Sequence, residues 1–271
     1  MITLREENPK SFTEFVSLVE KYQKLFSGEL WYRGCGRADY KLVPSLYRHN
    51  TETTIDKIAI LEQQLMTRFR QRSIPLQTRS LVDDWDTLFF MQHYRIPTRL
   101  LDWTENPFIA LHFAVMSAEF STTKTSGLKF KKPAAVWLMN PVIWNRKALS
   151  HQSYNGGVLV AGDEPLKGYQ PRETFTGMNN FPVAIYGAHN SPRIVAQRGV
   201  FVIFGQNVLP MESLYTKESF PESSLIKIVL SVEYLPDIRK AVLNHGITES
   251  VVYPDFEGLA MEMRRNFGFE V

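Results

Sequence analysis

The spacing of apolar residues changes along this 271-residue chain, and that change constrains the fold more than any other feature. Up to about residue 119, apolar side chains recur every three to four residues, as they do on one face of a helix. From about residue 134 onwards, short β-branched or aromatic runs alternate with Gly, Pro and Asn, which is typical of strands and turns. Helices followed by strands predict an α+β fold.

The predicted helices begin at recognisable capping residues. Ser11 and Glu14 have the capping-box spacing at the start of a helix that we expect to end near Phe26. Thr104 is predicted to cap an apolar helix that has Pro107 in its first turn and ends near residue 119. The other predicted helices span residues 54–72, 84–93, 236–245 and 254–267.

The predicted strands are short and are separated by irregular segments. They span residues 30–33, 134–139, 183–186, 200–204, 226–230 and 250–253. Residues 156–180 are rich in glycine and polar side chains, so we expect them to be irregular. Residues 1–271 are predicted to form a single domain, and the polar segment 121–132 is its best candidate for an exposed loop or a subdomain boundary.

Composition excludes several classes of protein. With 44% hydrophobic and 22% charged residues, the chain can bury a sizeable core. It has no apolar run of about 18 residues and no signal-peptide pattern at its start, so we expect a cytoplasmic protein without a membrane partner. Cys35 has no partner for a disulfide. The net charge of +3 permits contact with nucleic acid without demanding it.

Common catalytic motifs are absent from the sequence. None of the six histidines belongs to a His-Glu-x-x-His pattern, and the spacing of Asp83, Asp84 and Asp86 suits a helix start better than a cation site, so no metal site is predicted. There is no P-loop, no Gly-x-Gly-x-x-Gly after a strand, and no serine nucleophile elbow.

Two polar segments are hard to explain by packing alone. In the first, Arg33 ends an apolar run and is followed by Gly34, which would let a ligand approach the backbone. An ion pair between Arg33 and a buried Asp102 explains the arginine equally well.

The second segment, residues 91–104, places seven kinds of polar or aromatic side chain between two apolar helices. Such density indicates either a polar network that fixes a turn or a ligand pocket. Arg99 and Asp102 could pair with each other, but that pair would not explain His93 and Tyr94. We therefore expect one cavity to be lined by Arg33, His93, Arg99 and Asp102.

Both segments resemble the FRG domain family, which is named for a Phe/Tyr-Arg-Gly motif. Tyr32-Arg33-Gly34 matches that motif, and residues 40–48 and 92–111 match further blocks. Residues 197–201 and 253–260 are similar to later blocks, so the resemblance spans roughly residues 12–267. The resemblance implies a bacterial or phage-borne protein, met near mobile elements and antiviral defence genes, that acts as a toxin or anti-phage effector with an antitoxin protein as partner.

Tyr32-Arg33-Gly34 is also similar to the first core strand of ADP-ribosyltransferases, in which an arginine orients NAD. That similarity implies a helix-rich N-terminal half packed on a mixed, mainly antiparallel sheet, NAD as substrate, and transfer of ADP-ribose to a macromolecule, with RNA or DNA favoured. It assigns catalysis to Arg33 and His93 with Glu257 or Glu249 as the acid. It assigns NAD binding to Tyr32, Arg33, Gly34, Tyr47, Tyr94, Arg99 and Asp102.

A non-catalytic module that binds nucleic acid or protein is the alternative. In that case the ligand would be held by Arg33, Arg48, Arg99 and Arg198 together with the neighbouring aromatic residues. A deep cavity that holds Arg33, His93 and a carboxylate favours catalysis, whereas a shallow, positively charged face favours binding.

Overall fold

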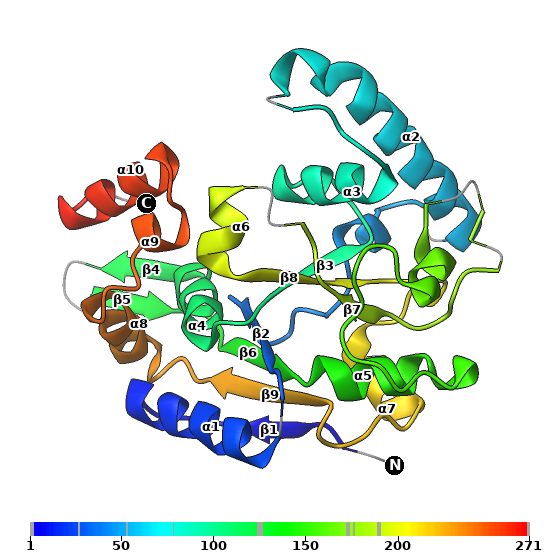
Figure 1. Ribbon diagram of the computed structural model, residues 1–271. Coiled ribbons are helices and arrows are strands. Elements are labelled where there is room, and N and C mark those ends of the chain that lie inside the picture. Colours follow the sequence, from blue (N-terminus) through cyan, green and yellow to red (C-terminus); the bar gives the residue numbers. More distant parts are fainter. Residues whose placement is uncertain are drawn as a thin grey trace.

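The fold is built on a seven-stranded sheet with helices on both faces (Figure 1). The computed structural model describes residues 3–26, 28–52, 54–77, 79–123, 127–171, 174–175, 177–188 and 191–269. In spatial order the strands are β1 (Arg5–Glu7), β9 (Leu225–Leu230), β6 (Ala134–Met139), β2 (Trp31–Cys35), β3 (Leu100–Thr104), β8 (Gly199–Ile203) and β7 (Val183–Ile185). Only β1 and β9 run parallel among these neighbours. The predicted α+β class and the mixed, mainly antiparallel sheet are therefore confirmed.

The two central strands come from the N-terminal half of the chain, which the sequence analysis expected to be helix-rich. β2 and β3 lie side by side at the middle of the sheet. The β3 strand was missed because it is only five residues long and contains Asp102, whose side chain interrupts the apolar pattern. Helices and strands are thus interleaved along the chain, and the expected order of helices first and strands later is wrong.

The helices confirm most of the predicted capping. The hydroxyl of Ser11 accepts a hydrogen bond from the backbone N–H of Glu14, and Asp83 accepts one from Asp86. The longer helices are α1 (Phe12–Leu25), α2 (Ile55–Ser73), α3 (Asp84–His93), α4 (Pro107–Met116), α5 (Pro141–Ala148), α8 (Leu235–Asn244) and α10 (Phe256–Asn266). The shorter ones are α6 (Pro192–Gln197), α7 (Met211–Lys217), α9 (Glu249–Val252) and four 3₁₀ segments (Ser45–Arg48, Ile74–Leu76, Ser150–Gln152 and Glu164–Tyr169).

Three local predictions are wrong. Asn106, not Thr104, caps α4, because Thr104 is the last residue of β3 and its hydroxyl donates to the carbonyl of Gln197. Residues 249–252 form helix α9 instead of a strand, since the backbone N–H of Val252 donates back to the carbonyl of Thr248 and no strand of the described residues pairs with them. The predicted loop 121–132 largely forms a hairpin of β4 (Phe120–Thr123) and β5 (Gly127–Phe130), and its residues 124–126 lie outside the described part of the chain.

Two hydrophobic clusters cover the two faces of the sheet. On one face, apolar side chains from α1, α4 and α8 pack against alternate residues of β2, β6 and β9. On the other face, side chains from α3, α5 and α7 pack against the remaining residues. No helix in the described ranges is long and apolar enough to cross a membrane.

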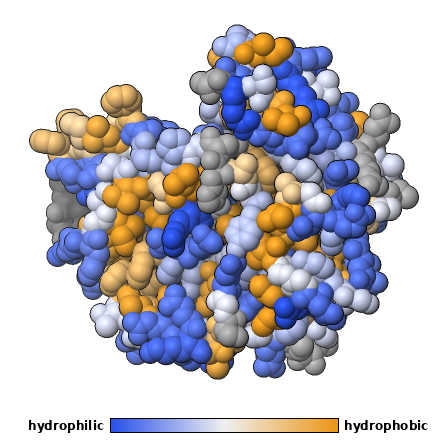
Figure 2. All heavy atoms as spheres, in the orientation of Figure 1, coloured by the Kyte–Doolittle hydropathy of each residue, from blue (hydrophilic) through white to orange (hydrophobic). Residues whose placement is uncertain are grey.

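The C-terminal helix α10 packs on α9 and projects from the body of the molecule (Figure 1). Its outer side carries apolar residues at helical spacing, and they form an orange patch at the edge of the surface in Figure 2. The exposed members are Phe256, Leu259, Met263 and Phe267.

Candidate functional site

A cavity of about 290 Å³ lies where β2 and β3 meet at the centre of the sheet. The two strands pair only at Tyr32 and Thr104, whereas β2 pairs with β6 along its whole length. The short ladder leaves room between the strands, and Arg33 and Asp102 both line that room. We call it the Arg33 cavity.

Arg33 uses one nitrogen to bridge the gap between the strands. Its Nη1 donates to the backbone carbonyl of Asp102. The arginine therefore contacts the main chain of Asp102 and not its carboxylate, so the ion pair considered from the sequence is not formed. Arg33 forms no salt bridge with any of the described residues, so its positive charge has no counter-ion among them.

A chain of hydrogen bonds orients the Asp102 carboxylate. The backbone N–H of Leu100 donates to the Thr98 hydroxyl at 3.1 Å, and this hydroxyl in turn donates to Oε1 of Gln92. The amide group of Gln92 is thereby fixed so that its Nε2 donates to Oδ2 of Asp102 at 2.8 Å. The other carboxylate oxygen, Oδ1, accepts no hydrogen bond from a described residue and is available to a ligand.

His93 lines the same cavity from the last turn of α3. Burial lowers the pKa of its imidazole, and the nearby charge of Arg193 lowers it further, while Asp255 acts in the opposite direction. The ring lies edge-on to Tyr94, and its Nδ1 is 3.4 Å from the Ser191 hydroxyl. At neutral pH the imidazole is therefore neutral and can accept a proton.

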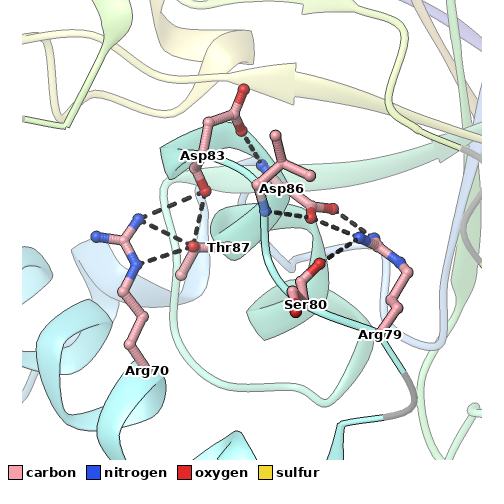
Figure 3. Close-up of polar contacts among 7 residues, drawn as sticks. Arg70, Arg79, Ser80, Asp83, Asp86 and Thr87 are labelled. Carbon is pink, nitrogen blue, oxygen red and sulfur yellow. Dashed lines mark hydrogen bonds and ion pairs between the residues drawn. The ribbon is translucent and has the colours of Figure 1, made fainter.

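Helix α3 is fixed in place by two arginines (Figure 3). The guanidinium of Arg79 makes two bonds, of 2.5 and 2.7 Å, to the carboxylate of Asp86. Arg70 donates to the Thr87 hydroxyl and to the carbonyl of Asp83. These contacts hold the first turn of α3, and α3 in turn presents Gln92 and His93 to the cavity.

Two further arginines line the cavity and were missed as site residues by the sequence analysis. Arg95 follows α3, and Arg193 is in the first turn of α6. The sequence contains one signal for Arg95. The helix ends at His93 and Tyr94, and the next position, where glycine is usual, holds an arginine instead. No local signal marks Arg193, which reaches the cavity because α6 packs against β8 and α9.

Gly34 lines the cavity, but its lack of a side chain serves helix packing. A Cβ at this position would lie 1.9 Å from the carbonyl oxygen of Ala110 and 2.7 Å from the backbone nitrogen of Ala114. Helix α4 thus requires a glycine at this position, and the contact between the Gly34 backbone and a ligand stays a prediction.

Arg99 and Tyr47 belong to the core and do not line the cavity. Arg99 is fully buried and bonds Oε1 of Glu62 at 2.7 Å and the carbonyls of Tyr169 and Phe204. Tyr47 donates its hydroxyl to the carbonyl of Gly205. Buried guanidinium groups need such partners, so the expectation that Arg99 shares a cavity with Arg33 is wrong.

The two glutamates and Tyr94 also lie away from the cavity lining. Glu249 is buried and receives two bonds from Arg265, which hold its pKa below the ordinary value although burial, the largest influence, acts to raise it. Glu257 is exposed in the first turn of α10. Tyr94 has 60% of its surface exposed. Asp102 is therefore the carboxylate that the described residues place in the cavity.

The four arginines of the alternative binding module do not share one face. Arg99 is buried, Arg48 donates twice to the carbonyl of Val43, and Arg198 is exposed outside the cavity. Only Arg33 of this group reaches the cavity.

Compared with known families, residues 28–122 match the FRG domain. The match includes β2, α3, β3 and α4, and so includes Arg33, Gln92, His93 and Asp102. No curated protein and no solved structure matches the chain significantly. Arg193 and Tyr253, which also line the cavity, lie outside the matched segment.

Proposed function

We propose that this protein, which contains an FRG domain, binds NAD in the Arg33 cavity and transfers ADP-ribose to a macromolecule. The observation that supports this most directly is the pairing of opposite charges in one cavity. Arg33 has no carboxylate partner among the described residues, and the Asp102 carboxylate is oriented by Gln92. An NAD molecule presents both an anionic pyrophosphate and a glycosidic carbon that becomes positive as its bond breaks, so it requires both kinds of group.

The residues of the cavity suit NAD in two further respects. Aromatic side chains, including Phe113 and Phe201, line the cavity and can pack against a ligand ring. Trp103 also lines the cavity, and its indole N–H is buried without a hydrogen-bond partner in the described part of the chain. A carboxamide oxygen would satisfy that donor. At about 290 Å³, the cavity is near the lower limit of roughly 300 Å³ for small-molecule sites, so it would enclose one half of NAD while the other half extends outward.

In the proposed reaction the bond between ribose C1′ and the nicotinamide nitrogen breaks, and its electron pair leaves with nicotinamide. Asp102 stabilises the positive charge that develops on the ribose. An oxygen or nitrogen of the acceptor then forms a bond to C1′ and loses its proton. The neutral imidazole of His93 can accept this proton, because its lowered pKa keeps it unprotonated at neutral pH.

For the acceptor we propose a nucleic acid, RNA or DNA, and for the biological role a bacterial toxin or anti-phage effector held in check by an antitoxin. The net charge of +3 supports an anionic acceptor. The family resemblance supports the role.

The test is to incubate the protein with labelled NAD and with total RNA, DNA or lysate, and to measure which fraction takes up label. Asp102→Asn should abolish labelling without loss of folding, because the amide keeps the size of the side chain but not its charge. Glu257→Gln is the matched control, since Glu257 is exposed outside the cavity. Labelling that survives in Asp102→Asn but is lost in Glu257→Gln would refute the assignment of the acid.

A non-catalytic binding module is the second candidate, because the cavity holds three arginines against one carboxylate. It predicts that the cavity binds an anionic ligand while NAD remains intact. Release of nicotinamide from NAD, measured by chromatography, decides between the two.

A further inference from the structure

We infer that Arg95 and Arg193, which line the same cavity as Arg33, form a binding site there for the pyrophosphate of a dinucleotide. The inference deepens the proposed function, on which it rests, by naming the part of the ligand that these two arginines bind. Neither arginine forms a salt bridge with a described residue.

Arg95 occupies a backbone position at which an arginine is costly. The backbone N–H of Arg95 donates to the carbonyl of Gln92, and that of Ile96 donates to Met91. These two bonds form a Schellman motif at the end of α3. The residue directly after the helix C-cap of such a motif, here Arg95, is usually glycine because its φ is positive. Arg95 has a φ of 60°. Unlike Arg198, Arg95 also lines the cavity, and it forms no salt bridge with a described residue, so this combination points to a role toward a ligand.

Arg193 is held rigidly by its surroundings and still has free donors. Its guanidinium lies over the ring of Tyr253, 4.2 Å from the ring centre. Gln197 of the same helix donates to the carbonyl of Val252, so α6 and α9 are tied together next to this contact. No carboxylate among the described residues forms a salt bridge with this guanidinium, so N–H groups of Arg193 are available to phosphate oxygens.

The two arginines are close enough to act on the same group. The hydroxyl pKa of Tyr253 is raised by burial and lowered by the charges of both Arg193 and Arg95. The carboxylate of Asp255 acts to raise the pKa of nearby His93. Its Oδ1 accepts the hydrogen bond that caps α10, from the backbone N–H of Gly258. Two like charges in one cavity repel each other, and a bound anion removes this repulsion.

A pyrophosphate fits this arrangement better than a nucleic-acid backbone does. A backbone requires cations in a row along an exposed face. Arg48 is engaged with the Val43 carbonyl and Arg99 is buried, so neither extends the pair into such a row. Adjacent phosphates of a dinucleotide require two guanidinium groups within one cavity, which Arg95 and Arg193 provide.

The test is calorimetric titration with inorganic pyrophosphate, ADP-ribose and a single-stranded oligonucleotide. Arg193→Gln and Arg95→Gly should each weaken pyrophosphate and ADP-ribose binding by about tenfold or more, the loss expected for a hydrogen bond to a charged group. Arg198→Gly is the matched control, because Arg198 also has a positive φ (46°) at a helix end but lies outside the cavity. It should bind like the wild type.

Unchanged pyrophosphate binding in both cavity variants would overturn the inference, as would an oligonucleotide that binds through these arginines when pyrophosphate does not. A spectroscopic check is independent of activity: bound pyrophosphate should raise the pKa of His93, because it offsets the charge of Arg193. Binding that depends on the arginines without release of nicotinamide from NAD would refute the proposed reaction and leave this site standing. Release of nicotinamide with unaffected binding in both variants would refute the site alone.

Discussion

Replacement of Arg95 by glycine should stabilise the protein while it removes a ligand contact. An L-residue in the left-handed region costs about 1–2 kcal/mol, and Arg95 has a φ of 60°. Glycine avoids that cost but loses about 0.5–1 kcal/mol more conformational entropy on folding. The difference predicts a gain of about 0.5–1 kcal/mol in the free energy of unfolding, or a rise in Tm of about 1–4 °C for a chain of this size.

Thermal and urea unfolding of wild type, Arg95→Gly and Arg95→Ala measure this gain. Arg95→Ala removes the same side chain but keeps a Cβ at the positive φ, so it should not be stabilised. A loss of stability in Arg95→Gly would show that the arginine side chain supports the fold. The reasoning that the side chain is retained for a ligand would then be refuted.

Three other predictions test the contacts around the site. Gly34→Ala should lower the free energy of unfolding by about 3 kcal/mol, the upper range for overpacking, because its Cβ would meet the backbone of α4; a loss under about 1 kcal/mol in urea unfolding would contradict this packing. Glu62→Gln should lower the free energy of unfolding by about 3–5 kcal/mol, because it leaves the Arg99 charge buried without its partner. The variant protein that does fold should keep its NAD-dependent labelling. Loss of labelling in folded protein would instead place Arg99 in the site. Hydrogen bonds from Arg79 lower the pKa of Asp86 in the folded protein. The pair therefore stabilises the fold above the unfolded-state pKa of about 3.9, and this contribution is lost as the pH falls through the lower pKa of the folded state. The difference in stability between wild type and Asp86→Asn should shrink below about pH 4, and a difference independent of pH would contradict the ion pair.

The local features of the fold were predictable from the sequence because they depend on residues a few positions apart. Ser11 and Asp83 cap helices as predicted, since each bonds a backbone N–H three residues ahead. The strand at residues 134–139 was predicted with its observed bounds, because every residue in it is apolar. The Tyr32-Arg33-Gly34 block and residues 92–104 were sufficient for the resemblance to the FRG family, which the match over residues 28–122 supports.

Only the tertiary structure decided the partner of each charge. From the sequence, Arg99 and Asp102 were equally good candidates for the cavity. In the structure Arg99 forms a salt bridge with Glu62, and both side chains are buried in the core. Arg193 lies 160 residues after Arg33, and the packing of α6 against β8 and α9 brings it to the same cavity. A side chain's partner depends on which distant segments cross near it, and apolar periodicity and capping patterns within a short window hold no information about that crossing.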